Sequence, residues 1–285
     1  MAKKFRAFAM AAKRKRLLTE EVTAFRRLVY QHHQQHWRDF PWRRTHDPYK
    51  ILVSEVMLQQ TQADRVVPKY RAFIRSFPTI RLLAKAPLRK VLAGWQGLGY
   101  NRRAVALQRA AQAIANQYGG RVPQHIEALR RLPGVGRYTA AAVLVFAFNQ
   151  PTAMVETNIR SVFLHHFFPR QRLVRDDELQ PLIAQTLDRR QPRRWYEAVM
   201  DYGAWLKKQL PNPGRRSRHY VRQSTFAGSH RQLRGQLIRA VLDSPRSLAS
   251  LVQDFERPTS AVRQAVTELV REGLIARRGQ TYIIQ

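Results

Sequence analysis

Between residues 17 and 205, apolar residues recur at intervals of three and four positions, which is the spacing of one helix face. The pattern is clear in LTEEVTAFRRLVYQHH, ILVSEVMLQQT, ADRVVPKYRAFIRSF, RKVLAGW, AVALQRAAQAIANQY and IEALRRL. Short breaks that contain Pro or Gly separate these stretches. Strand-like alternation is scarce here, so the pattern predicts an all-α body.

The C-terminal region, residues 229–285, has a different order of predicted elements. Amphipathic helices are expected over 231–243, 247–255 and 258–272, followed by two short strands around Arg278-Gly279-Gln280. Three helices and a β-hairpin are typical of a winged-helix-like domain. Such domains contact either DNA or other proteins, and the sequence leaves both open.

The most extreme feature of the composition is its positive charge. The 285 residues include 51 Lys and Arg against 19 Asp and Glu, a formal net charge of +32. Such an excess predicts a polyanionic partner, and nucleic acid is the commonest one. No apolar run approaches about 18 residues, so no membrane partner is expected. The chain has no cysteine, which excludes disulfides and thiolate metal sites and fits a cytoplasmic setting.

Two basic segments flank the helical body. Residues 1–16 form a basic arm, interpreted as a solvated tail, a DNA-contacting arm or an organelle transit segment. Residues 207–228 read as a basic, Pro-containing linker. Either the linker faces phosphates, with Arg215 and Arg216 as the candidate contacts, or it is simply solvated.

Residues 132–139, LPGVGRYT, place two glycines where a second helix begins. Glycine permits positive φ and close approach of the backbone, and a helix start offers free N–H groups to an anion. The segment therefore predicts either a hairpin that grips a phosphate or an ordinary turn with a glycine cap.

Two carboxylates lie in surroundings that are not acidic. Glu55 lies at the edge of an apolar helix stripe, and Glu156 lies where a helix begins. Breaking a glycosidic bond needs one acid and one carboxylate, and burial raises the pKa of the acid into the useful range. The structural alternatives are an exposed or ion-paired Glu55 and a helix-capping Glu156.

Five segments in this order resemble the MutY adenine DNA glycosylases, within the helix-hairpin-helix (HhH-GPD) glycosylase superfamily. They are DPYKILVSEVMLQQTQ (47–62), GLGY (97–100), LPGVGRYTAAAV (132–143), VETNIRSV (155–162) and MDYGAW (200–205). The resemblance covers about residues 25–205. It implies a two-lobed helix-hairpin-helix DNA glycosylase fold, here followed by the winged-helix-like domain.

The resemblance also implies a division of the chain. The glycosylase core would span 17–206, with one six-helix lobe at 46–149 and a second lobe from 17–45 plus 150–206. The linker 207–228 would replace the cluster loop of the family. The protein is expected to be a monomer, associated with the nucleoid, that acts on duplex DNA containing a mismatched or damaged base pair.

The resemblance also implies roles for individual residues. Glu55 matches the acid that protonates the leaving purine, and Glu156 matches the aspartate that stabilises the sugar cation, while Asn158 and Tyr138 match residues that order that site. A base must be flipped out of the duplex to be reached, and Tyr100 and Gln60 match residues that wedge into the helix. The predicted DNA-binding residues are Gln59, Gln60, Gln62, Tyr100, Leu132, Gly134, Val135, Gly136, Arg137, Arg215 and Arg216.

Departures from the family change the expectation. Glu156 is one methylene longer than the aspartate, and a misplacement of about 1 Å can cost about a hundredfold in rate. Lys207 stands where the first cluster cysteine would be, so no iron–sulfur cluster is expected. The winged-helix-like unit replaces the domain that recognises 8-oxoguanine. Tyr138 replaces the Schiff-base lysine of strand-cleaving relatives, which predicts a monofunctional glycosylase.

Removal of adenine opposite guanine or 8-oxoguanine, leaving an abasic site, is the favoured function. The first alternative is a thymine or uracil glycosylase at G·T or G·U mismatches, and the second is a DNA-binding protein without catalysis. No metal site is expected, because the histidine pairs at 32–33 and 165–166 are adjacent helical residues that point apart.

Overall fold

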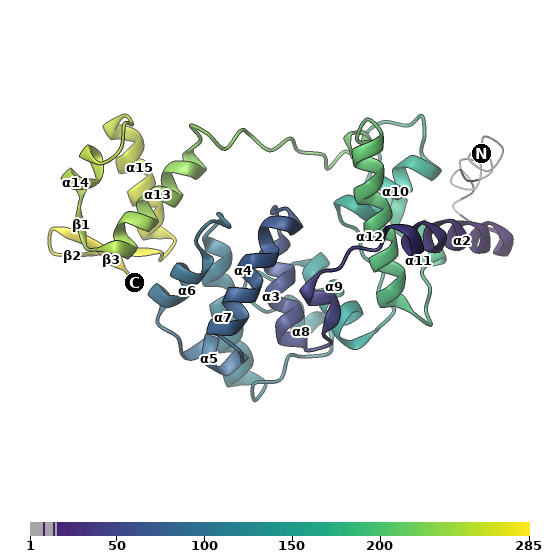
Figure 1. Cartoon of the computed structure of the whole chain (residues 1–285), viewed down its shortest axis with the longest axis horizontal. Coiled ribbons are helices and arrows are strands. Elements are labelled where there is room, and N and C mark those ends of the chain that lie inside the picture. The colour runs from purple at the N-terminus through teal and green to yellow at the C-terminus, as the bar shows by residue number, and fades with distance from the viewer. Residues whose placement is uncertain (1–7, 9–13, 15) are drawn as a thin grey trace. The chain divides into compact units, whose positions relative to one another are not determined.

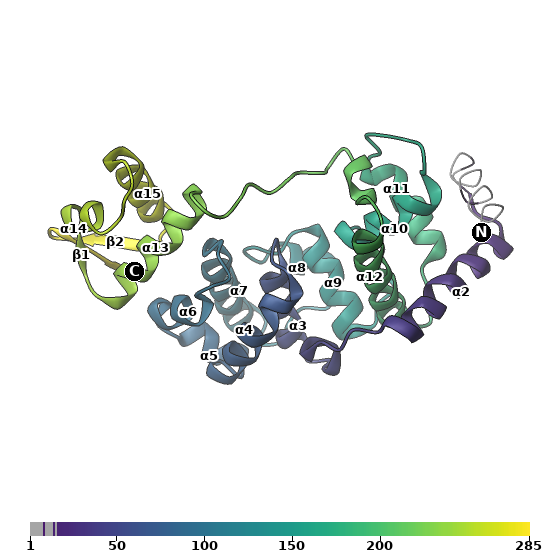
Figure 2. The ribbon, with the colours of Figure 1, turned by 45° about the horizontal axis from the view of Figure 1, so that its top comes forward.

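The structure is a computed structural model in which Phe8, Arg14 and residues 16–285 are described. The predicted basic arm, residues 1–16, lies almost entirely outside the described residues. Helices dominate the described part of the chain, and its one sheet consists of three short strands near the C-terminus (Figures 1 and 2). The prediction of an all-α body is confirmed.

The chain forms two compact units. The first contains residues 1–51, 124–126 and 136–222, and the second contains residues 52–123, 127–135 and 223–285. Helices α3 (Pro48–Leu58) and α8 (Ile126–Arg130) each begin in the first unit and continue in the second. The second unit joins the central helices to the C-terminal region, so these units are divided differently from the predicted lobes.

The first unit is formed by helices that pack against one another. Its elements are α2 (Thr19–His36), η1 (Pro41–Arg44), α9 (Arg137–Phe148), α10 (Thr157–Phe167), α11 (Asp176–Thr186), α12 (Pro192–Gln209) and η2 (Pro213–Arg216). Residues 139–146 of α9 are all buried, as expected for a helix that is apolar on every face. Helix α12 packs against both α10 and α2, which fixes the start of α10.

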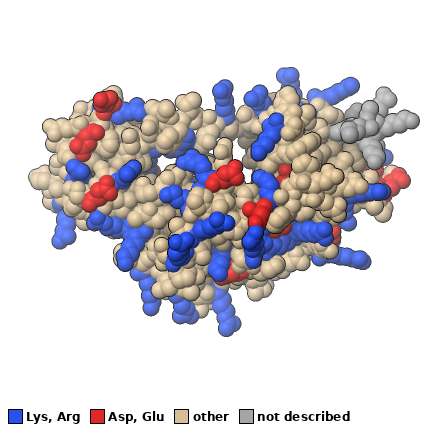
Figure 3. Space-filling model, in the orientation of Figure 1, with Lys and Arg blue, Asp and Glu red and all other residues tan. Residues whose placement is uncertain are grey.

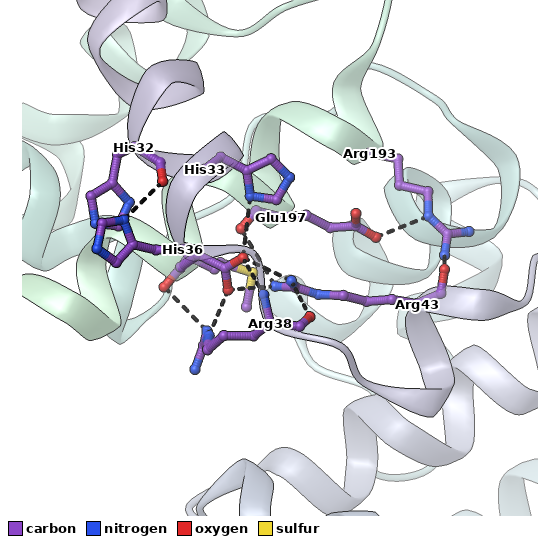
Figure 4. Close-up of polar contacts among 9 residues, drawn as sticks. His32, His33, His36, Arg38, Arg43, Arg193 and Glu197 are labelled. Carbon is purple, nitrogen blue, oxygen red and sulfur yellow. Dashed lines mark hydrogen bonds and ion pairs between the residues drawn. The ribbon is translucent and has the colours of Figure 1, made fainter.

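A buried carboxylate holds three segments of the first unit together. Asp201 of α12, which is 2% exposed, accepts hydrogen bonds from Arg38 Nε at 2.6 Å and from both terminal nitrogens of Arg43 at 2.8 Å. His33 Nδ1 lies 3.2 Å from the same carboxylate (Figure 4). Burial alone would raise the pKa of Asp201, but these neighbours lower it well below its ordinary value. Asp201 thus has a structural role.

The central helices of the second unit are α4 (Ala63–Ser76), α5 (Ile80–Lys85), α6 (Leu88–Trp95) and α7 (Arg102–Gln117). Helix α7 packs against α5 and α6. No helix among the described residues is long and apolar enough to cross a membrane.

The C-terminal region of this unit has the predicted order of helices and hairpin. Its elements are α13 (His230–Asp243), β1 (Arg246–Ser247), α14 (Leu248–Gln253), α15 (Thr259–Arg271), β2 (Ile275–Arg278) and β3 (Thr281–Ile284). The antiparallel sheet has the order β1-β3-β2. Strand β1 was not predicted, because two residues are too few to show an alternating pattern.

Candidate active site and DNA-binding surface

Glu55 lies in a buried part of α3. All residues from Ile51 to Met57 are buried, and Glu55 itself is only 4% exposed. It is the one acidic residue in an otherwise mostly apolar run of this helix. The alternative of an exposed glutamate is therefore wrong. A buried carboxyl group on such a helix is a candidate proton donor.

Glu156 lies at the N-cap of α10, and its side chain folds back onto the first turn. Oε1 accepts hydrogen bonds from the backbone N–H groups of Asn158 at 2.7 Å and Ile159 at 2.8 Å. Oε2 accepts a third from Asn158 Nδ2 at 3.2 Å. The capping alternative is thus realised. It does not exclude a catalytic role, because a carboxylate has about four acceptor positions and three are used.

Helix α12 approaches the start of α10 very closely. A Cβ atom added to Gly203 would lie 2.2 Å from the carbonyl oxygen of Asn158. Glycine is therefore required for the backbone that carries Asn158 to lie where it does. The same contact fixes the turn that orients the Glu156 carboxylate.

Lys207 follows Gly203 by one helical turn and is half-buried. Burial lowers the pKa of Lys207, the negative charge of Glu156 opposes this shift, and the charge of Arg38 adds to it. The residues present do not fit an iron–sulfur cluster, because the chain has no cysteine to ligate it. No group of three potential metal ligands gathers in the described part of the chain.

The 132–136 hairpin buries two of its apolar side chains and exposes both of its glycines. Leu132 and Val135 are 4% and 5% exposed, whereas Gly134 and Gly136 are exposed. Gly134 has a φ of +75°, and a Cβ atom there would lie 2.7 Å from Ala106 Cβ. Gly136, the N-cap of α9, has an ordinary φ of −83°, and a Cβ atom there would meet nothing within 4 Å.

The two glycines of this hairpin therefore have different roles. Gly134 is needed for the turn and for packing on α7. At Gly136 neither the backbone nor the packing requires glycine, so the absent side chain leaves open space before the first N–H groups of α9. This space suits an approaching anion.

Both predicted wedge residues have an unusual backbone. Among the described residues, only four other than glycine have a positive φ, and Gln60 at 55° and Tyr100 at 49° are two of them. A side-chain-bearing residue in this region is strained, and such strain concentrates at functional sites. Something must hold both turns in place.

Arg103 holds both turns with one guanidinium group. It donates to the backbone oxygens of Val56, Met57 and Gln59, and also to Leu98 O, Gly99 O and Thr61 Oγ1. Burial lowers the pKa of Arg103 to about 10. The sequence analysis missed this residue. Its position in the sequence could have marked it, because Arg103 lies one turn before the buried Leu107, on the side of α7 that faces the core.

Some of the remaining predicted DNA-binding side chains are exposed, and others already make hydrogen bonds within the protein. Gln62, Arg137 and Arg215 are exposed, and Gln59 Nε2 donates to Gly134 O at 3.3 Å. Arg216 instead donates to the carbonyl oxygens of Leu164 and Pro169, beside the C-terminal end of α10, and burial lowers its pKa. In this structure its guanidinium caps a helix.

Comparisons with known proteins identify the family of this chain. The HhH-GPD superfamily base excision DNA repair protein family matches residues 53–183. An adenine DNA glycosylase of Mycobacterium tuberculosis (strain ATCC 25618 / H37Rv) is 34% identical over 274 residues, which cover 86% of this chain and 88% of that protein. The chain belongs to the adenine DNA glycosylase family of the HhH-GPD superfamily.

A human relative and a solved structure extend the comparison. The adenine DNA glycosylase of Homo sapiens is 38% identical over 201 residues, 65% of this chain. This chain spans only 36% of that relative's length. The structure of a thermostable thymine-DNA glycosylase has a TM-score of 0.58 and 30% identity, and the match covers 68% of this chain and 88% of that one. The predicted helix-hairpin-helix glycosylase fold is confirmed.

Proposed function

We propose that this protein is a DNA glycosylase that extrudes a mispaired base from duplex DNA and hydrolyses its N-glycosidic bond. Adenine opposite guanine or 8-oxoguanine is the proposed target, supported by the names of its relatives. The observation that carries the proposal is Glu55, a carboxyl group 4% exposed in an otherwise mostly apolar helix.

The proposed reaction divides the work between two carboxyl groups. The Glu55 carboxyl group gives its proton to the adenine, which departs with the electron pair of the bond to C1′. The Glu156 carboxylate stabilises the positive charge that develops on the sugar. Water then adds to C1′ and loses a proton, which leaves an abasic site. Tyr138 offers no amine for a Schiff base, so we expect no strand cleavage through that position.

In this proposal, DNA binding depends mainly on electrostatic attraction between basic side chains and phosphates. The net charge is +32, and lysine and arginine side chains are scattered over the visible face and outnumber the acidic ones there (Figure 3). Affinity for duplex DNA should then fall with salt, with a log–log slope of about −0.9 per phosphate contact. A flat salt response, measured by fluorescence anisotropy, contradicts this part of the proposal.

A thymine or uracil glycosylase is the second candidate. The similarity to a thymine-DNA glycosylase structure at 30% identity favours it. The same acid and carboxylate would serve either leaving base, so these two groups do not distinguish the candidates. The base that is released from test duplexes does.

A single-turnover base-release assay tests the proposal on duplexes that contain 8-oxoguanine·A, G·A, G·T or G·U. The variants are Glu55→Gln and Glu156→Gln. The latter retains Oε1, which accepts both backbone N–H groups, so the helix cap is preserved. Glu127→Gln is the matched control, because that side chain is 69% exposed and lies 3.4 Å from Arg130 on the same helix.

We expect the wild type and Glu127→Gln to release adenine and the other two variants to lose the activity. Release of thymine or uracil instead selects the second candidate. Binding without release from any of the four duplexes contradicts the enzymatic proposal.

A further inference from the structure

Tyr100 is held by the C-terminal region of the chain. Its hydroxyl oxygen accepts hydrogen bonds from Arg231 Nη1 and from Gln223 Nε2, both at 2.6 Å. The Arg231 guanidinium also lies over the tyrosine ring, 5.2 Å from its centroid, and 5.5 Å from the ring of Phe226. Residues more than a hundred positions away in the sequence therefore orient this side chain.

A second guanidinium reaches the same ring. Arg103 lies 5.6 Å from the centroid of Tyr100, while it also donates to Leu98 O and Gly99 O in the preceding turn. The ring is thus within cation–π distance of two arginines, one from α7 and one from α13. The contacts of Arg103 act mainly on the backbone of the turn, and those of Arg231 act on the tip of the side chain.

Further contacts tie the C-terminal helices to this part of the unit. Arg102, two residues after Tyr100, lies 3.7 Å from Glu272, and Arg89 donates to the carbonyl oxygen of Leu242. Glu272 also accepts from Arg234 of α13 at 2.5 Å. The turn that bears Tyr100 is therefore connected to α13 and to the end of α15.

A side chain that enters a base stack must keep its direction while the stack opens. Tyr100 has a strained backbone, so its direction depends on the groups that hold it. We propose that Arg231 is a positioning residue for base extrusion, which holds Tyr100 ready to enter the duplex and makes the C-terminal region part of the flipping apparatus. This inference rests on the proposed function, in which Tyr100 is the wedge.

The test compares Arg231→Ala, Arg231→Lys, Tyr100→Phe and the double variant Tyr100→Phe/Arg231→Ala in the full chain. Tyr100→Phe keeps the ring and removes only the hydroxyl that accepts the two hydrogen bonds. Arg239→Ala is the matched control, because Arg239 is an exposed arginine on the same helix. All proteins carry Glu55→Gln, so that extrusion is observed apart from base release.

The measurement is stopped-flow fluorescence of 2-aminopurine placed beside the adenine of a G·A duplex. We expect Arg231→Ala to slow extrusion about tenfold, the size of losing one charge-assisted hydrogen bond. Tyr100→Phe should slow it less, and Arg231→Lys should restore part of the rate. The double variant should be slower than Arg231→Ala by a smaller factor than Tyr100→Phe shows alone, because only the hydrogen bond from Gln223 is then left to lose. Affinity for undamaged duplex and the unfolding temperature should stay near those of Arg239→Ala.

Three results overturn the inference. The first is unchanged or faster extrusion in Arg231→Ala, since faster extrusion makes the contact a brake. The second is an additive double variant, and the third is the absence of any fluorescence change in every protein. Failure of the proposed function is a separate result, namely extrusion here without base release by the protein that retains Glu55.

Discussion

Gly203→Ala is a direct test of how the structure places Glu156. An added Cβ atom would lie 2.2 Å from the carbonyl oxygen of Asn158, 2.6 Å from its carbonyl carbon and 2.9 Å from its Cα atom. An ordinary carbon–oxygen contact is about 3.3 Å, so the two helices must separate by about 1 Å. The obstacle is backbone, and no change of rotamer relieves it.

The cost follows from this displacement. Overpacking of a well-packed contact costs about 1–3 kcal/mol, and a clash with backbone belongs at the upper end. Alanine returns about 1 kcal/mol through its higher helix propensity. The expected net loss is therefore about 2 kcal/mol, which lowers the unfolding temperature by about 4–8 °C. Because the displaced turn orients the Glu156 carboxylate, we also expect base release to slow about a hundredfold.

Thermal unfolding and single-turnover base release of the full chain measure the two effects. Gly235→Ala is the control, because a Cβ atom at that helical position meets nothing within 4 Å. It should leave the rate unchanged and stabilise the protein by about 1 kcal/mol at most. If Gly203→Ala keeps the wild-type unfolding temperature and rate, the reasoning is refuted. A lower unfolding temperature with an intact rate shows that the α10–α12 contact supports the fold and not the chemistry.

Three further predictions concern the hairpin, the buried arginine and a buried histidine. Gly136→Ala should fold normally but bind duplex DNA about tenfold more weakly, as anisotropy would show, since its Cβ atom enters the space before the N–H groups of α9; unchanged affinity contradicts this role. Arg103→Met should lower the free energy of unfolding in urea by about 3 kcal/mol, because buried carbonyl groups lose a charged donor, and a loss below about 1 kcal/mol contradicts that account. Burial lowers the pKa of His166 to about 3 from 6.5, with His165 adding to the shift, so the unfolded state takes up this proton first. Stability should therefore be complete above about pH 6.5 and fall below it, and urea midpoints measured from pH 7.5 to 5 should show a smaller fall in His166→Gln.

Local features of the sequence determined much of this protein. Apolar spacing predicted the helical body because one buried helix face requires it. The order of elements in 229–285 was predicted because each amphipathic helix there contains its own pattern. The glycines of LPGVGRYT marked the turn before α9, where Gly134 has its φ of +75°. The net charge predicted a polyanionic partner, and the absence of cysteine excluded disulfides and thiolate metal sites.

Tertiary structure alone decided which distant residues meet. Nothing in the spacing of Arg103 or Arg231 names Tyr100 as their partner, because side-chain partners depend on how the helices pack. Gly203 resembles any helical glycine until the backbone of Asn158 lies against it. Nothing in the sequence marks Asp201 of α12 as buried, and only the packed structure brings Arg38 and Arg43 to its carboxylate. Periodicity is a property of one segment, whereas burial and pairing are properties of the packed chain.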